Sequence, residues 1–147
     1  MKKYLNIKLI LLFTILGVGL SSCDDEDDIA DRLVYSEWET EDLGRRAENG
    51  EDLFSVFTFD YDGRGAETLY YISDGEFYRQ DLFKWEYFFD YDDYMVLTYR
   101  DGKEFYDAVI FPRNGMKAIH YLSYNDFYNH IGGARVYFEE FPRSGRY

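Results

Sequence analysis

Turn signals punctuate the chain at near-regular intervals between residues 48 and 115, and they constrain its fold more than any other feature. Glycine beside Asn or Asp is typical of tight β-turns, and short β-prone segments between such turns form antiparallel hairpins. The turn signals are Glu48-Asn49-Gly50, Asp60-Tyr61-Asp62-Gly63-Arg64-Gly65, Ser73-Asp74-Gly75, Asp90-Tyr91-Asp92-Asp93, Asp101-Gly102 and Arg113-Asn114-Gly115. They delimit predicted strands near residues 35–41, 52–60, 66–73, 77–89, 94–100, 103–111, 116–123 and 134–141. Eight strands in meander order predict an all-β fold, either a small barrel or a strongly curled sheet.

Alternation of apolar and polar residues predicts which strand faces point inward. It is clearest from Leu82 to Phe89, where the odd-numbered positions are all aromatic and should face the core, with Trp85 as a core residue. In the second strand both faces are apolar. In the seventh, alternation leaves undecided whether the face of Met116 or the face of Lys117 points inward. The set proposed to form either the core or a ligand-binding face is Trp38, Phe57, Phe83, Trp85, Tyr87 and His120.

Residues 1–22 have the pattern of a secretory signal peptide. Three lysines precede an apolar stretch of 12 residues from Leu9 to Leu20, which is too short to span a bilayer. Its ending, Leu20-Ser21-Ser22-Cys23, resembles the cleavage box of bacterial lipoproteins. The resemblance implies that Cys23 becomes the lipidated first residue of the mature protein and anchors it in the membrane. The alternative for this single cysteine is a buried or reactive thiol, and a disulfide within the chain is excluded.

An acidic run follows the cysteine: Asp24, Asp25, Glu26, Asp27 and Asp28. One interpretation is a disordered tether over residues 23–32, kept extended by self-repulsion. The run also resembles the export signal of Bacteroidetes-type lipoproteins, which implies display on the outer face of the outer membrane, with the periplasmic face as the alternative. The net charge of −13 disfavours nucleic acid and anionic membrane surfaces as partners.

Two segments are predicted to contain helical turns. Asn125 could cap a short helix that runs through Ile131 and ends at Gly132 and Gly133. Between Asp28 and Trp38, helical spacing precedes an extended stretch, so that segment is ambiguous.

The pattern over residues 33–123 resembles the lipocalin-like domains of secreted bacterial lipoproteins. The matching features are Leu33 with Trp38, Phe57-Thr58-Phe59-Asp60 with Gly63 and Gly65, Phe83-Lys84-Trp85, and Leu97-Thr98-Tyr99 with Asp101-Gly102. Ser36 stands where that family usually has a glycine two residues before the opening tryptophan. The resemblance implies that residues 33–147 form a barrel with one open end and an apolar ligand.

Motifs for chemistry are weak. Asp60-x-Asp62-Gly63 begins like a calcium loop, but Arg64 and Tyr71 occupy positions that need oxygen ligands. The two histidines, His120 and His130, lack partners at zinc-ligand spacing, and no nucleophile elbow is present. We therefore expect no enzyme activity, no metal and no cofactor.

These features lead to two function hypotheses. The first is a membrane-anchored, surface-exposed lipoprotein whose β domain binds a small apolar or amphipathic ligand. The alternative is a structural or interaction subunit of an envelope complex that contacts glycan or protein through its aromatic surface. An apolar cavity of about 300 Å³ or more would favour the first, and a core filled by Trp38, Phe57 and Trp85 would favour the second.

Overall fold

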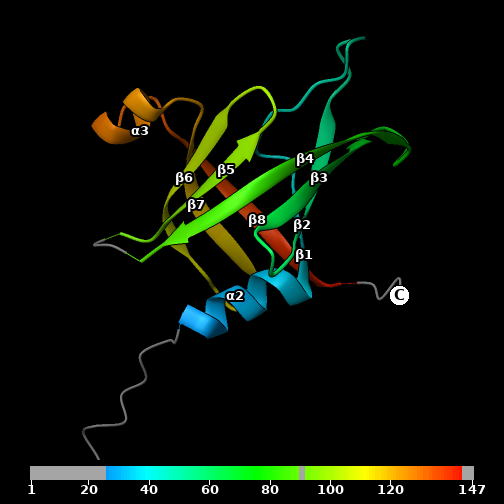
Figure 1. Ribbon diagram of the computed structural model, residues 1–147. Helices are drawn as coiled ribbons and strands as arrows, with labels where there is room; N and C mark the ends of the chain where they lie inside the picture. Colours follow the sequence, from blue (N-terminus) through cyan, green and yellow to red (C-terminus); the bar gives the residue numbers. More distant parts are fainter. Residues whose placement is uncertain (1–25, 90–91, 144–147) are drawn as a thin grey trace, which may run out of the picture.

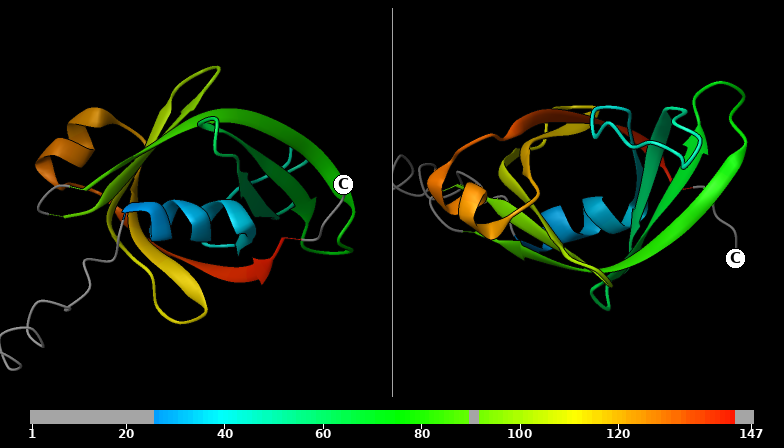
Figure 2. Two further views of the ribbon diagram at one scale, coloured as in Figure 1. Left: turned by 60° about the horizontal axis from the view of Figure 1, so that its bottom comes forward. Right: turned by 90° about the horizontal axis from the view of Figure 1, so that it is seen from above.

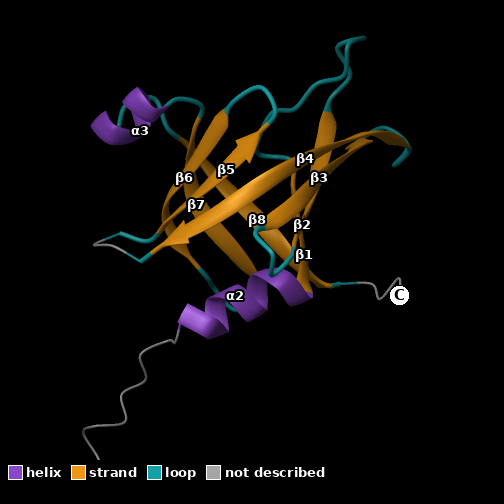
Figure 3. Ribbon diagram, viewed as in Figure 1, coloured by secondary structure: helices purple, strands orange, loops and turns teal. Residues whose placement is uncertain are grey.

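A computed structural model describes residues 26–89 and 92–143 and shows eight strands in a meander. The strands are β1 (Ser36–Thr40), β2 (Leu53–Phe59), β3 (Arg64–Tyr71), β4 (Phe77–Phe88), β5 (Tyr94–Tyr99), β6 (Lys103–Ile110), β7 (Gly115–Tyr121) and β8 (Ala134–Pro142). Every neighbouring pair is antiparallel, and β1 pairs with β8, so the sheet closes into a barrel (Figures 1 and 3). The predicted all-β meander is confirmed, and the closed form replaces the curled sheet.

The inward faces of the strands form an aromatic and aliphatic core. In β2 the residues at odd positions, from Leu53 to Phe59, are buried and those between them are half-buried. The odd-numbered face is therefore the inward one, which the two apolar faces in the sequence left undecided. In β7 the inward set is Met116, Ala118 and His120. The largest buried rings belong to Trp38, Tyr106, Phe57, Phe59 and Phe138.

The side chains on the predicted inward face of β4 become less buried along the strand. Phe83 is buried, Trp85 and Tyr87 are half-buried against the core, and Phe89 is exposed. Phe89 lies one residue beyond the end of β4, where no paired strand fixes its direction. The prediction that Phe89 points inward is therefore wrong.

Helix α2 (Glu26–Tyr35) covers one end of the barrel (Figure 2). Its Leu33 and Val34 are buried in the core, and the indole Nε1 of Trp38 donates to the Leu33 carbonyl at 3.1 Å. The structure thus places a helix where the sequence analysis assigned residues 26–32 to an extended tether. Neither described helix is an apolar segment long enough to cross a membrane.

Two arginines fix α2 to the barrel. Arg32 bonds Glu140 of β8 through its Nε at 3.0 Å, and its Nη2 donates to the Pro112 carbonyl at 2.7 Å. Arg143 donates to the carbonyls of Val34 and Phe59. The hydrogen bond from Arg32, opposed by burial, lowers the pKa of Glu140. These contacts tie the helix to β8, to Arg143 after it and to the loop between β6 and β7.

The second predicted helix exists with different boundaries. Helix α3 (Tyr124–Asn129) begins at Ser123, whose Oγ accepts from the Asp126 amide at 3.1 Å, so the predicted cap at Asn125 is wrong. The helix ends at His130, which adopts the left-handed conformation (φ 54°) in place of the predicted Gly132. The Ser123 hydroxyl bonds the Asp126 amide, which has no partner within the helix, so Ser123 and not Asn125 takes the cap position.

Candidate functional site

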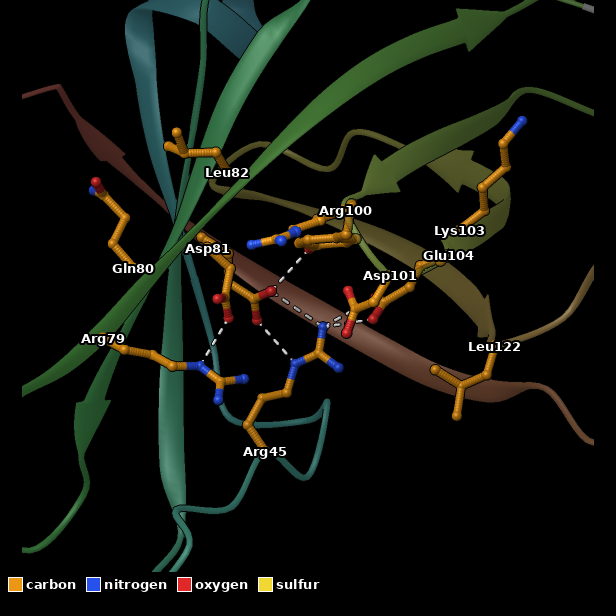
Figure 4. Close-up of a pocket in the computed structure, with 13 residues that line it drawn as sticks. Arg45, Arg79, Gln80, Asp81, Leu82, Arg100, Asp101, Lys103, Glu104 and Leu122 are labelled. Atoms are coloured by element: carbon orange, nitrogen blue, oxygen red, sulfur yellow. Dashed lines mark hydrogen bonds and ion pairs between the residues drawn. The ribbon is translucent and has the colours of Figure 1, made fainter.

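The barrel end opposite α2 holds a pocket of about 470 Å³, which we call the mouth pocket. One wall is Arg79–Leu82 of β4, and the other is the β5–β6 hairpin from Tyr99 to Glu104. Figure 4 shows Arg45 rising between these walls, beside Glu104. The strand order explains the location, because the β1–β2 loop and the β3–β4 and β5–β6 hairpins all turn at this end.

An ion-pair network forms the floor of the mouth pocket. The Arg45 Nε lies 2.9 Å from Glu67 Oε1, and its Nη2 lies 2.8 Å from Glu104 Oε1. Glu67 points inward from β3 with a side chain only 2% exposed, and Glu104 points inward from β6. One guanidinium from the β1–β2 loop therefore bridges two carboxylates on opposite sides of the lumen.

Further donors saturate the two carboxylates. Glu67 accepts from the Ser55 hydroxyl at 2.7 Å and from the Tyr99 hydroxyl at 2.8 Å. Glu104 accepts from the Tyr106 hydroxyl at 3.0 Å and contacts His120 Nε2 at 2.9 Å. Within the described residues, no buried side-chain polar atom lacks a hydrogen-bond partner. A fully satisfied polar network of this kind fixes the geometry of the floor.

The network also keeps its members charged or neutral as their roles require. Burial alone would raise the pKa of Glu104, but the His120 hydrogen bond and the Arg45 charge outweigh it and lower that pKa. Burial opposes the charge of Arg45, yet Glu67 and Glu104 raise the pKa of its guanidinium. Burial raises the pKa of the Tyr99 hydroxyl, with further contributions from Tyr106 and Glu67. Arg45 and Glu104 are therefore ionised at neutral pH, and Tyr99 stays a hydrogen-bond donor.

The rim of the mouth pocket carries more positive than negative charge that is not already paired. Arg79 and Asp81 pair with each other at 2.9 Å. Within residues 26–89 and 92–143, Arg100 and Lys103 on the β5–β6 hairpin form no ion pair, and neither does Asp101 between them. The rim thus has an excess of free cations in a chain whose net charge is −13.

The predicted site residues lie mostly away from the mouth pocket. Trp38, Phe57 and Phe83 are buried in the core, and Trp85 and Tyr87 pack against it, so these rings fill the lumen. Trp85 donates its indole N–H to the Asp60 and Arg64 carbonyls. His120 alone lies in the floor network.

The predicted lipidation site, Cys23, and the predicted export signal, residues 24–28, lie at or before the start of the described chain. Cys23, Asp24 and Asp25 lie outside the described residues, Glu26 and Asp27 lie in α2, and Asp28 is exposed there.

Sequence reasoning missed the residues that build the floor. Arg45 is 22 residues from Glu67 and 59 from Glu104 along the chain, so no local spacing connects them. One signal was available: Ser55, Glu67 and Glu104 share the strand face of the buried Phe57, Leu69 and Tyr106. A carboxylate at an inward position requires a buried partner.

Comparison of the chain with protein-family models, with curated proteins and with solved structures finds no match. The described residues also contain no group of three or more His, Cys, Asp or Glu that could hold a metal ion. What the structure establishes is a closed antiparallel barrel of eight strands, compatible with a lipocalin-like fold, and a polar pocket at its open end.

Proposed function

We propose that this chain is a lipid-anchored, non-enzymatic binding protein with a lipocalin-like barrel that engages a polar partner at the mouth pocket. One observation carries the proposal: α2 and the aromatic core fill one end of the barrel, and the other end opens into a charged pocket of about 470 Å³. That volume lies in the range of known ligand pockets.

The character of the lining favours a polar partner over the apolar ligand expected from the sequence. Apolar ligands need a lining of hydrophobic and aromatic side chains. The rings expected to provide it, those of Trp38 and Phe57, are at most 1% exposed and have no free surface. The accessible lining instead combines charged side chains with Leu82 and Leu122 at the rim.

The position of α2 supports an arrangement relative to the membrane. If Cys23 carries the lipid, only three residue steps separate it from Glu26, which is roughly 11 Å at full extension. The α2 end would then lie next to the membrane. The mouth pocket, at the opposite end, would point away from it toward molecules in solution.

The proposal is tested by ligand-induced stabilisation of the full chain in lipid nanodiscs. Bound ligand at about a hundredfold excess over Kd stabilises a protein by about 2.7 kcal/mol, which shifts its denaturation midpoint. The compound panel should contain amino acids, small organic acids, sugars, laurate and retinol. We expect stabilisation by polar compounds only, and we expect Lys103→Glu at the rim to abolish it for anionic ones.

Lys84→Glu is the matched control, because Lys84 is an exposed lysine of β4 away from the mouth pocket. It should leave the stabilisation unchanged. Stabilisation by laurate or retinol that survives Lys103→Glu would place the ligand in the lumen and overturn the proposal.

A further inference from the structure

Strand β4 is longer than the strand that follows it, and its first half has no partner on the β5 side. β4 has 12 residues and β5 has 6. β3 pairs with β4 from Phe77 to Lys84, whereas β5 pairs with it only from Phe83 to Phe88. In the described part of the chain, residues 77–82 therefore form an open sheet edge on the β5 side (Figure 1). Residues 79–82 of this edge line the mouth pocket.

The direction of the free backbone groups follows from one hydrogen bond. The Trp85 amide donates to the Gly63 carbonyl at 2.8 Å, so the backbone groups of Trp85 point to the β3 side. Successive residues of a strand point their N–H and C=O groups to alternate sides. Those of Leu82 and Gln80 accordingly point to the β5 side, where β5 has already ended.

Of the devices that usually protect exposed edges, this edge has inward charges, since Arg79 and Asp81 lie at inward positions and pair with each other. Natural proteins block edges with proline, bulges, inward charges or a covering loop. No proline lies between Phe77 and Leu82, and the β3–β4 register shift leaves Tyr78 unpaired near the start of the strand, outside Gln80–Leu82. Leu82 is 69% exposed, and so is Leu122 on the rim of the mouth pocket. An unpaired strand edge beside a pocket is the geometry used for strand addition.

We propose that the partner is an extended, acidic peptide segment of another protein, which adds as a strand to the free edge of β4 at Gln80–Leu82. Backbone groups of the peptide would pair with those of Gln80 and Leu82. Alternate side chains would point into the mouth pocket, where Arg100 and Lys103 are free of ion pairs within the described chain. Acidic side chains complement those cations. This inference rests on the proposed function, because it identifies what the mouth pocket binds.

The experiment measures peptide binding to the full chain in nanodiscs by biolayer interferometry, with empty nanodiscs as the reference. The probe is acetyl-Val-Glu-Val-Glu-Val-amide. A second peptide replaces both Glu by Lys, and a third methylates the amide nitrogens that would face β4. We expect binding of the first peptide, at least about tenfold weaker binding of the second, and loss of binding for the third, because its donors are blocked.

Two variants of one residue separate backbone pairing from side-chain contact. Leu82→Pro removes an amide that faces the open side, so it should leave β3–β4 pairing intact and abolish binding. Leu82→Ala keeps the amide and should retain most of the binding. Equal denaturation midpoints would show that both variants fold, and hydrogen exchange should show new protection of the Gln80 and Leu82 amides only when peptide binds. If Leu82→Pro does not fold, the methylated peptide and the hydrogen exchange of the parent protein still separate backbone pairing from side-chain contact.

Two outcomes overturn the inference. If the methylated peptide binds as well as the first, the pocket recognises acidic side chains or free anions without strand addition, and the proposed function stands. If no peptide binds and the Gln80–Leu82 amides exchange unchanged, the peptide partner is wrong. The compound panel, read with Lys103→Glu, then decides separately whether the proposed function survives.

Discussion

At the scale of single residues, Arg45 has the largest share in the mouth pocket, because its one guanidinium pairs with two inward carboxylates. Removing one member of a buried ion pair typically costs about 3–5 kcal/mol, since the remaining charge is left uncompensated. We expect Arg45→Met to lower the free energy of unfolding by about 3 kcal/mol at pH 7, measured by urea denaturation. Arg46→Met is the matched control: its side chain is 70% exposed and pairs with an exposed Asp52, so the midpoint should barely move.

The cost of Arg45→Met should depend on pH. The pKa of Glu104 is lowered in the folded protein, so its ionisation contributes stability above the unfolded value of about 4.3 and this contribution is lost as pH falls through the folded pKa. Arg45 is one cause of that lowering, and the variant lacks it. The difference between parent and variant should therefore shrink when the urea melts are repeated at pH 3. An equal difference at pH 7 and pH 3 would mean that packing of the arginine stem, not its charge, stabilises the floor.

Residue roles were predictable from the sequence where they depend on local pattern. Burial of Phe83 follows from alternation within a single strand. The role of Glu67 does not, because its partners Arg45 and Tyr99 come from a loop and a strand that only barrel closure brings together. The apolar-ligand expectation stays a prediction: the aromatic residues were identified, but which of them would fill the lumen depends on how α2 packs.

At the scale of elements, α2 belongs to the core, although its sequence does not indicate this. Its acidic start resembles a solvated tether, and its helix is stabilised by contacts with distant residues such as Glu140 and Pro112. Strands were easier to predict, because each is bounded by its own turn signal and paired with its neighbour in sequence. Prediction of α2 would have required knowing the barrel end that the helix covers.

This difference gives a prediction for Leu33, which is fully buried on α2. Truncating a buried leucine to alanine typically costs about 2–5 kcal/mol, so Leu33→Ala should lower the free energy of unfolding by about 3 kcal/mol in urea melts followed by circular dichroism. Asp28→Ala, on the exposed part of the same helix, should have almost no effect. A loss below about 1 kcal/mol for Leu33→Ala would be typical of a surface position and would return the segment to a tether.

At the scale of the whole molecule, the two ends of the barrel have different chemistry. The α2 end follows the proposed lipid attachment at Cys23, and the opposite end carries the mouth pocket. A net charge of −13 keeps such a domain from lying flat on an anionic surface. A lipid anchor at one end and a binding site at the other therefore predict a defined orientation on the cell.

Single engineered thiols test that orientation, because Cys23 is the only native cysteine and would be blocked if it carries the proposed lipid. Asp101→Cys places a thiol at the mouth pocket, and Asp28→Cys places one on α2, within roughly 18 Å of Cys23 along an extended chain. On intact cells a bulky polyethylene-glycol maleimide should label Asp101→Cys rapidly and Asp28→Cys slowly, since the membrane shields the second site. Detergent should equalise the two. If both thiols react equally on intact cells, the barrel does not stand with its mouth outward. Protection of both until the outer membrane is opened would instead assign the protein to the periplasmic face, leaving the binding proposal intact and removing the surface display.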